Sequence, residues 1–489
     1  MPTTASYRTE PERFDMAEMP QSKTFPHTPF VPYDPIVQFH ETAAWCFGGD
    51  AEAWEYTGWR DEVLAATTTV SLHGHLNPSP TLRLTGPDAL AFLSSVCVNS
   101  LATFRVGASR HAIMTDEQGR VAAHGMLLRL AEDDFVTYWL SPYLGYRLAQ
   151  RPDLDVTAED LTGRVFLFQL SGPRSLEVLE GAAEENLHDI KFLRHRLATI
   201  ADAEVRVIRI GMSGTLAYEV HGPVEHAIPV YEALMAAGEE YGIRKMGVQA
   251  YMCQHTQGGF GQMYYHFPLP WGEDENLQAF FAGLGFPPIG KDLRLHGSAG
   301  KDLDRRYRTP YELGWGHMVK FDHDFIGCEA LAREAAAAAR TMVTLVWNPE
   351  DIADVYQSQF RKGAEHPYMN MPNHFMYEVG DREHQQSLWA DRVLVGGRDV
   401  GTSSGRCFSV HSGEMLSLAT VETAVADEGT EVVVLWGDPG TRQKEIRATV
   451  ARFPYLVDPV RNEKFDVSTI PSKYEPAAAA AGETRTANA

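Results

Sequence analysis

A glutamate near the middle of the chain stands in the segment whose residue types are best suited to hold a ligand. Glu219 lies in the string Gly211-Met212-Ser213-Gly214-Thr215-Leu216-Ala217-Tyr218-Glu219-Val220, between one expected strand and the next. Burying a carboxylate among aromatic and aliphatic neighbours is costly unless a partner pairs with it. A flat heterocycle with adjacent N–H donors would satisfy both oxygens of Glu219. The alternative, which the string alone favours, is an exposed glutamate on an alternating strand.

Two other short motifs suggest chemistry that their surroundings do not support. His73-Gly74-His75 would place two imidazoles on one face of a strand, as a metal site requires. No second histidine pair or HxxE motif lies nearby, so a polar pocket wall or an exposed loop is the better interpretation. The segment 401–405 matches GxSxG, but a nucleophile elbow needs a following helix, and more strand follows here. The sequence also lacks a GxGxxG or Walker motif, which disfavours a Rossmann domain and an NTPase.

The elements that would position Glu219 contain an internal repeat. Residues 82–93 (LRLTGPDALAFL) reappear in pattern as residues 168–179 (FQLSGPRSLEVL). Each copy predicts a short apolar strand, a Gly-Pro turn and a helix with apolar residues at i, i+3 and i+4. A unit used twice predicts two related lobes that face each other, with a ligand between them. The alternative is a chance match of a common turn.

Apolar runs predict the remaining elements. Strands are expected at 135–140 and 205–210, an amphipathic helix at 225–242, and a loop-like region at 272–312. From residue 340 onward short strands dominate, at 341–347, 393–400, 415–420, 431–436 and 445–450, which predicts a small barrel or sandwich. We therefore expect an N-terminal extension (1–60), two interleaved lobes (61–335), a β-rich barrel domain (336–470) and a flexible tail (471–489).

Composition limits the class of protein and its partners. The chain has 489 residues, 44% of them hydrophobic, and a formal net charge of −22. The negative charge argues against nucleic acid and an anionic membrane surface as partners. Five cysteines without CxxC spacing indicate a reducing, cytoplasmic location, and the first fifteen residues lack the apolar region of a signal peptide. No apolar window is long enough to span a membrane.

Several longer strings resemble the glycine-cleavage T-protein family, from about Trp59 to Val467. They are the two Leu-x-Gly-Pro-type units, the Gly-x-x-Gly-x-x-x-Tyr-Glu string that ends at Glu219, and the segments 310–316 (PYELGWG), 319–327 (VKFDHDFIG), 416–420 (LSLAT) and 433–437 (VVLWG). The last four are most similar to the branch of tetrahydrofolate-dependent aryl O-demethylases, with the sesamin-type methylene transferases as relatives. The resemblance implies an α+β fold of three lobes in a cloverleaf: two related α/β lobes and a C-terminal β-barrel-like domain around a folate.

The resemblance also implies roles for individual residues. Glu219 stands where the family glutamate binds the pterin edge, and Phe260 where the demethylases carry a tryptophan beside the pterin. Tyr251 matches the tyrosine placed at the ether oxygen, where its proton would help the aryl oxygen to leave. Asn99 and Ser100 stand where aminomethyltransferases have Asn-Asp. Because a hydroxyl cannot replace the carboxylate charge, Ser100 argues against aminomethyl transfer.

Two further departures concern the substrate. Leu140 stands in place of an arginine that pairs with the substrate carboxylate in vanillate demethylases. Those enzymes also carry a Gln-x-x-His pair, and of the matching positions in this chain only His75 is polar. A buried carboxylate without a cation is strongly disfavoured. We therefore expect a neutral aromatic substrate, with Tyr265 and His266 of the tract 261–267 lining its pocket. Ordinary packing of that tract under a loop is the alternative.

The expected function is one-carbon transfer from an aromatic ether to tetrahydrofolate. Both a methylenedioxyphenyl lignan such as sesamin and a neutral methoxyphenol are compatible with the motif residues. The alternatives are a folate-dependent demethylase of a non-aromatic substrate, an aminomethyltransferase, and a non-catalytic folate-binding protein of the same fold. Six basic residues would meet the anionic folate tail unless they form a solvated loop: Lys291, Arg294, Lys301, Arg305, Arg306 and Arg308.

Overall fold

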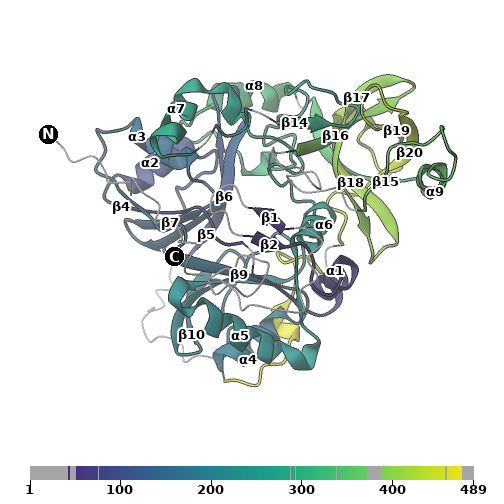
Figure 1. Cartoon of the computed structure of the whole chain (residues 1–489). Helices are drawn as coiled ribbons and strands as arrows, with labels where there is room; N and C mark the ends of the chain where they lie inside the picture. The colour runs from purple at the N-terminus through teal and green to yellow at the C-terminus, as the bar shows by residue number, and fades with distance from the viewer. Residues whose placement is uncertain are drawn as a thin grey trace, which may run out of the picture.

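Three groups of strands surround a central helix in the computed structural model of the chain (Figure 1). The structure describes residues 42–44, 51–74, 76–286, 288–291, 293–337, 339–371, 387–457 and 460–475. Two of the groups are the expected related lobes, and the third is the C-terminal barrel. The central helix is α6 (Val248–Gly258), which lies where the three parts meet.

Lobe 1 is a five-stranded sheet with the order β5-β6-β7-β4-β8. Its elements follow the chain as β4 (Thr81–Thr85), α2 (Ala89–Val96), β5 (Ser109–Thr115), β6 (Val121–Ala131), β7 (Asp134–Tyr138), α3 (Tyr143–Ala149) and β8 (Thr157–Asp160). The three strands after α2 form an antiparallel meander, and β7 returns beside β4.

Lobe 2 repeats this plan in a six-stranded sheet with the order β10-β11-β12-β9-β3-β13. Its elements are β9 (Val165–Ser171), α4 (Ser175–Ala183), β10 (His195–Ile200), β11 (Ala203–Ile208), β12 (Ala217–Pro223), α5 (Ala227–Gly238), β13 (Arg244–Lys245) and, from earlier in the chain, β3 (Ser71–His73). β3 precedes lobe 1 in the chain and pairs with β9 of lobe 2, so lobe 2 includes a strand from before lobe 1.

The repeated Gly-Pro turns have the same backbone geometry in both lobes. Gly86 has φ 127° and Gly172 has φ 125°. A Cβ atom added to Gly86 would lie 2.3 Å from the Asp155 carbonyl oxygen, and one added to Gly172 would lie 2.4 Å from that of Thr69. Each turn thus packs against the segment that leads into the neighbouring strand, β8 or β3. The repeat predicted from the sequence is confirmed, and glycine is required in both copies.

The C-terminal strands form a closed barrel, as expected. Its strands are β15 (Arg340–Trp347), β16 (Ser387–Val395), β17 (Arg398–Ser409), β18 (Glu414–Glu422), β19 (Glu431–Trp436) and β20 (Lys444–Ala451). The sheet closes where β16 pairs with β19, and β14 (Arg294–His296) extends it beside β16.

Three sequence predictions were wrong in detail. The expected strand 393–400 is a hairpin, because Gly396 and Gly397 both take positive φ between β16 and β17. The loop-like region 272–312 contains α7 (Glu275–Gly283), whose N-cap Asp274 accepts from two backbone N–H groups. Among the C-terminal strands lies a helix, α9 (Pro349–Ser358), capped by Asn348. The helix expected at 225–242 is α5 flanked by two 3₁₀ turns.

The remaining described elements are β1 (Thr42–Ala44), β2 (Ala51–Ala53), α1 (Trp59–Thr68) and α8 (Cys328–Ala337). Short 3₁₀ helices lie at Val224–His226, Glu239–Tyr241, Pro270–Glu273, Gly316–Met318, Thr423–Val425 and Val467–Thr469. Within the described part of the chain, no helix has the length and apolar character that crossing a membrane requires.

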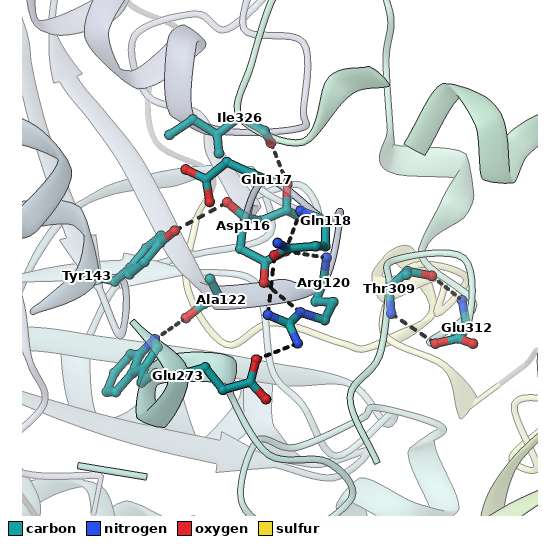
Figure 2. A network of polar contacts seen from close by, with 12 residues as sticks. Asp116, Glu117, Gln118, Arg120, Ala122, Tyr143, Glu273, Thr309, Glu312 and Ile326 are labelled. Atoms are coloured by element: carbon teal, nitrogen blue, oxygen red, sulfur yellow. Dashed lines mark hydrogen bonds and ion pairs between the residues drawn. The ribbon is translucent and has the colours of Figure 1, made fainter. Parts of the chain in front are cut away.

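A polar network joins the tip of the β5–β6 hairpin to the segment that connects the lobes with the barrel (Figure 2). Arg120 pairs with Asp116 at 2.7 Å and with Glu273 at 2.8 Å. The Asp116 carboxylate also accepts from the backbone N–H groups of Gln118 and Arg120. These contacts hold the hairpin against the helix that begins at Pro270.

The end of the described chain returns to lobe 2. The buried Arg209 donates to the carbonyl oxygens of Asn462 and Phe465. Of the segment expected to be a flexible tail, residues 471–475 contact lobe 2, where Ser472 donates to Glu180 and Lys473 pairs with Glu240. Residues 476–489 lie outside the described chain.

Candidate functional site

Three polar side chains form a row across the lobe 2 sheet. Glu219 on β12 is directly opposite Gln169 on β9, and Gln169 is directly opposite His73 on β3. Directly paired residues of antiparallel strands point to the same face of a sheet. The row is therefore continuous, and with a strand spacing of about 4.8 Å its two ends lie roughly 10 Å apart.

The Glu219 carboxylate is buried, contrary to the exposed alternative that its sequence context allowed. Glu219 is 5% exposed, and its Oε2 lies 3.0 Å from Nε2 of His221, two residues further along β12. The ring of Tyr138 on β7 of lobe 1 meets the His221 ring edge-on at 4.4 Å. This face of lobe 2 thus looks toward lobe 1, so the carboxylate lies between the two repeats.

Two acceptor or donor atoms beside Glu219 have no partner among the described residues. They are Oε1 of Gln169 and Nδ1 of His221, both buried. The other end of the Gln169 amide donates to Ser171 at 2.8 Å. Buried polar atoms of folded proteins are nearly always hydrogen-bonded. Their presence next to a buried carboxylate indicates a place for a polar ligand.

Tyr251 lies at the other end of the row. Its ring stacks on the His73 ring with 4.1 Å between centroids, and its hydroxyl lies 3.7 Å from Sδ of Met212. The helix that carries Tyr251 is buried on nearly every side. Its first turn is fixed by Glu62, whose buried carboxylate accepts from the Gly247 N–H at 2.9 Å. Burial raises the pKa of Glu62 to about 7.

Phe260 follows the end of α6 and belongs to a cluster of aromatic rings. Its partly exposed ring lies 5.1 Å from the ring of His111, 5.7 Å from His124, 5.9 Å from His255 and 5.4 Å from Trp315. Burial lowers the pKa of His111 to about 3 and of His255 to about 4, and it holds the pKa of His124 well below its ordinary range. The three imidazoles are therefore neutral at pH 7, and the wall around Phe260 carries no charge from them.

Asn99 and Ser100 lie at the edge of lobe 1. The Asn99 amide bridges the β5 backbone, since it donates to the His111 carbonyl and accepts from the Ile113 N–H, both at 2.9 Å. Asn99 thereby positions the strand that carries His111. Ser100 donates to Asp322 at 2.7 Å, and Ser100 and His323 together lower the pKa of that carboxyl.

The four residues expected around the substrate differ in their surroundings. Leu140 is fully buried in the largest apolar cluster, which contains the buried side chains of lobe 1. Both ring nitrogens of His266 have protein partners, the Gln262 N–H at 2.9 Å and Thr256 Oγ1 at 3.1 Å. Tyr265 reaches toward the Arg406 carbonyl at 3.4 Å, at the barrel. His75 lies outside the described residues. A substrate contact by any of these four stays a prediction.

The basic residues expected at the folate tail are mostly used inside the protein. Arg306 is 2% exposed and donates to three backbone carbonyls, and Arg308 is 3% exposed and donates to two. Burial lowers the pKa of both guanidinium groups to about 10. Lys291 pairs with Glu275, and Arg305 pairs with Asp399. Arg306, through the Leu388 carbonyl, and Arg305, through Asp399, fasten the connecting segment to the barrel. These four basic side chains are paired within the protein.

Sequence reasoning missed several residues of the site. His221 had a readable signal, because it is two residues from Glu219 on the same expected strand and so shares its face. Gln169 had none, since its position beside Glu219 depends on the register between separate strands. His73 was noted in the sequence as part of a polar pocket wall or an exposed loop, but its place beside Gln169 also depends on strand register. The cluster of His111, His124 and His255 is formed by two strands of lobe 1 and by α6, and no local sequence pattern predicts it.

Comparison with known proteins places the chain among relatives of this architecture. Residues 27–264 match the GCVT N-terminal domain family. The chain is 47% identical over 426 residues to a sesamin methylene transferase from Sinomonas sp., with 85% of this chain and 93% of that protein covered. It is 32% identical over 426 residues to a syringate O-demethylase from Sphingobium sp., with coverage of 82% and 89%.

A solved structure has the same fold. The glycine cleavage system aminomethyltransferase T from Bartonella henselae aligns with a TM-score of 0.61 at 16% identity, covering 86% of this chain and 95% of that one. The interleaved lobes, the closed barrel and the extent of these similarities lead to one conclusion: the chain belongs to the GCVT family of glycine-cleavage T-protein relatives.

Proposed function

We propose that this chain transfers a methyl or methylene group from a neutral aromatic ether to tetrahydrofolate and leaves a phenol or catechol. Its two similar relatives are named for a methylene transfer from sesamin and for the O-demethylation of syringate. The observation that carries the proposal is the row that links the buried Glu219 carboxylate to Tyr251 through Gln169 and His73.

The polar atoms of the row fit the edge of a pterin. A pterin offers adjacent N–H donors, and this end of the row offers acceptors: the Glu219 carboxylate and the unpartnered Oε1 of Gln169. His221 at 3.0 Å fixes the rotamer of Glu219, so the carboxylate is held in place before a ligand arrives. The row is about 10 Å long, and in this proposal the bicyclic ring lies along it, from Glu219 toward the ring of Tyr251.

Bound there, tetrahydrofolate would supply an amine that accepts the one-carbon group. The role of the chain is to position the partners and to handle the proton of the leaving oxygen. Tyr251 is the proton donor in this scheme, because a phenol matches the pKa of a departing aryl oxygen, about 10. General acid assistance of this kind contributes roughly 10²- to 10⁴-fold in rate. Phe260 offers a ring face or edge to the flat ligands.

The uncharged wall supports a neutral substrate. His111, His124 and His255 surround Phe260 and have pKa values far below 7, so they give no positive charge to pair with a carboxylate. Leu140 adds no cation. An aryl ether without a carboxylate avoids the cost of an unpaired buried charge.

Incubation with tetrahydrofolate and a panel of methoxy and methylenedioxy aromatics tests the proposal. We expect a phenol or catechol product together with a one-carbon adduct of the folate in mass spectrometry. A methyl adduct identifies demethylation and a methylene adduct identifies methylene transfer. If no ether in the panel alters the folate, while the protein is folded, the proposal is wrong.

A further inference from the structure

Four basic side chains lie at the junction between the two lobes and form no ion pair among the described residues. The junction is an antiparallel bridge between Ala108, just before β5 of lobe 1, and Arg194, just before β10 of lobe 2. Across it the Ser109 N–H donates to the Leu193 carbonyl at 2.9 Å. The four basic residues are Arg105, Arg110, Lys191 and Arg194.

The backbone brings these residues together from segments that are far apart in the chain. Arg105 and Lys191 each begin the turn that leads to one side of the bridge, and their carbonyl oxygens accept from the two bridge residues at 3.1 and 2.9 Å. Ala108 and Arg194 are directly opposite each other, so their side chains share a face. Arg110 shares that face because it lies two residues after Ala108. Diagonal neighbours of this kind are about 7–8 Å apart, within reach of two long side chains.

Arg110 and Arg194 are like charges held close together. The Arg110 guanidinium is partly buried, with its central carbon 5.5 Å from the centre of the Phe104 ring. Burial and the charge of Arg194 both lower the pKa of Arg110, which is the direction that repulsion between two cations produces. A partly buried charge is costly without a counter-charge.

Carboxylates on the adjoining segments do not supply that counter-charge. Glu132 pairs with Arg129 at 2.9 Å, and Asp189 pairs with Arg196 at 3.0 Å. The chain has 65 acidic and 43 basic residues, so composition alone does not explain four cations without ion pairs at one junction. The arrangement is the one that a bound anion would complete.

We propose that Arg110 and Arg194 bind a polycarboxylate at the junction of the lobes, while the other two cations of the junction add positive potential beside it. A guanidinium presents paired N–H donors that match the two oxygens of a carboxylate. The site is distinct from the row at Glu219. His195 lies in line with Glu219 across β10, β11 and β12, so the side chain of its neighbour Arg194 is directed to the other face of the sheet. The inference therefore does not depend on the proposed function.

Calorimetry with citrate at constant ionic strength tests the site directly. We expect saturable binding of citrate to the wild-type protein. The double variant Arg110→Gln/Arg194→Gln should bind citrate about tenfold more weakly or worse, because it loses the charge-assisted hydrogen bonds of both guanidinium groups. No saturable binding to the wild type, or equal affinity in the double variant, would overturn the proposal.

Two controls separate binding from net charge and from folding. Arg151→Gln/Arg164→Gln removes two positive charges from exposed ion pairs, so its citrate affinity should match the wild type. An equal loss in this control would reduce the effect to net charge and contradict the inference. Because Arg110 and Arg194 repel each other, their double variant should keep a Tm close to or above that of the wild type in dilute buffer. Citrate should raise the Tm of the wild type and not that of the double variant, and an equal rise in both would also contradict the inference.

Tetrahydrofolates with shorter and longer γ-glutamyl tails distinguish two sources of the carboxylates, the tail of a folate and a free polycarboxylate. If the longer tail tightens binding to the wild type and not to the double variant, the site holds the tail. If the longer tail has the same effect on both proteins while citrate binding still depends on the two arginines, the site holds a free polycarboxylate.

Discussion

Replacing Glu219 by glutamine tests the placement of the folate most directly. The substitution keeps the size of the side chain and one acceptor oxygen, but it removes the charge and turns an amide N–H₂ toward the ligand. If both carboxylate oxygens accept from the pterin, the variant loses one charge-assisted hydrogen bond and leaves a ligand donor facing another donor. A charge-assisted bond contributes about 1.5–3 kcal/mol and an unsatisfied buried donor costs about 1–3 kcal/mol.

The expected loss is therefore about 2.5–6 kcal/mol, or roughly 70- to 25,000-fold in the dissociation constant. Anaerobic calorimetry with tetrahydrofolate measures it. Glu219 is 5% exposed, and among the described residues its carboxylate contacts His221 at 3.0 Å, so the folded state should survive the substitution with a similar Tm. Glu177→Gln is the control, because Glu177 is a largely buried glutamate of α4 that pairs with Arg174 on the same lobe. Folate affinity within threefold of the wild type in Glu219→Gln, with an unchanged Tm, would refute the pterin assignment.

Three further predictions concern catalysis and stability. Tyr251→Phe should leave folate affinity unchanged and lower kcat at least about tenfold through loss of the proton donor, whereas unchanged turnover would remove Tyr251 from the mechanism. His255 stays neutral in the fold down to pH about 4. An unfolded histidine binds a proton below about pH 6.5, so acidification favours unfolding, by up to about 1.4 kcal/mol per pH unit between these values. Urea unfolding at pH 6.5 and pH 4.5 should show that His255→Asn loses less unfolding free energy on acidification than the wild type does. Equal losses in the two proteins would contradict the low pKa of His255. Arg120→Ala leaves the buried carboxylate of Asp116 without its cation (Figure 2), which should cost about 3–5 kcal/mol of unfolding free energy. Arg151→Ala, at an exposed ion pair, should leave the unfolding free energy nearly unchanged. Equal effects of the two substitutions would show that the network adds no stability.

Local sequence signals predicted the elements well where a single backbone conformation was required. The two Gly-Pro turns were readable because Gly86 and Gly172 adopt φ values that other residues rarely take. Strand β19 matched its expected bounds, Glu431–Trp436, because apolar residues run through it without interruption. The hairpin at Gly396 and Gly397 was missed, although this glycine pair is itself a turn signal.

The site residues, too, could be predicted only in part from the sequence. Family resemblance singled out Glu219, Tyr251 and Phe260, and the structure places all three around the meeting point of the lobes and α6. The structure does not bring the basic residues of 291–308 together as a free patch, because Arg306 and Arg308 donate hydrogen bonds to backbone carbonyls. Charge in a sequence gives no measure of burial, and a loop-like composition hid the fact that this segment packs under the barrel.

By itself, the sequence determined the twin lobes and the strand-rich C-terminal part, since each depends on the order of neighbouring residues. Only the tertiary structure decided that Glu219 is buried and that Gln169 and His73 connect it to Tyr251. The reason is that strand register joins residues that are 50 positions apart (Glu219 and Gln169) and 96 positions apart (Gln169 and His73), and hydrophobic periodicity carries information only about residues within the same element.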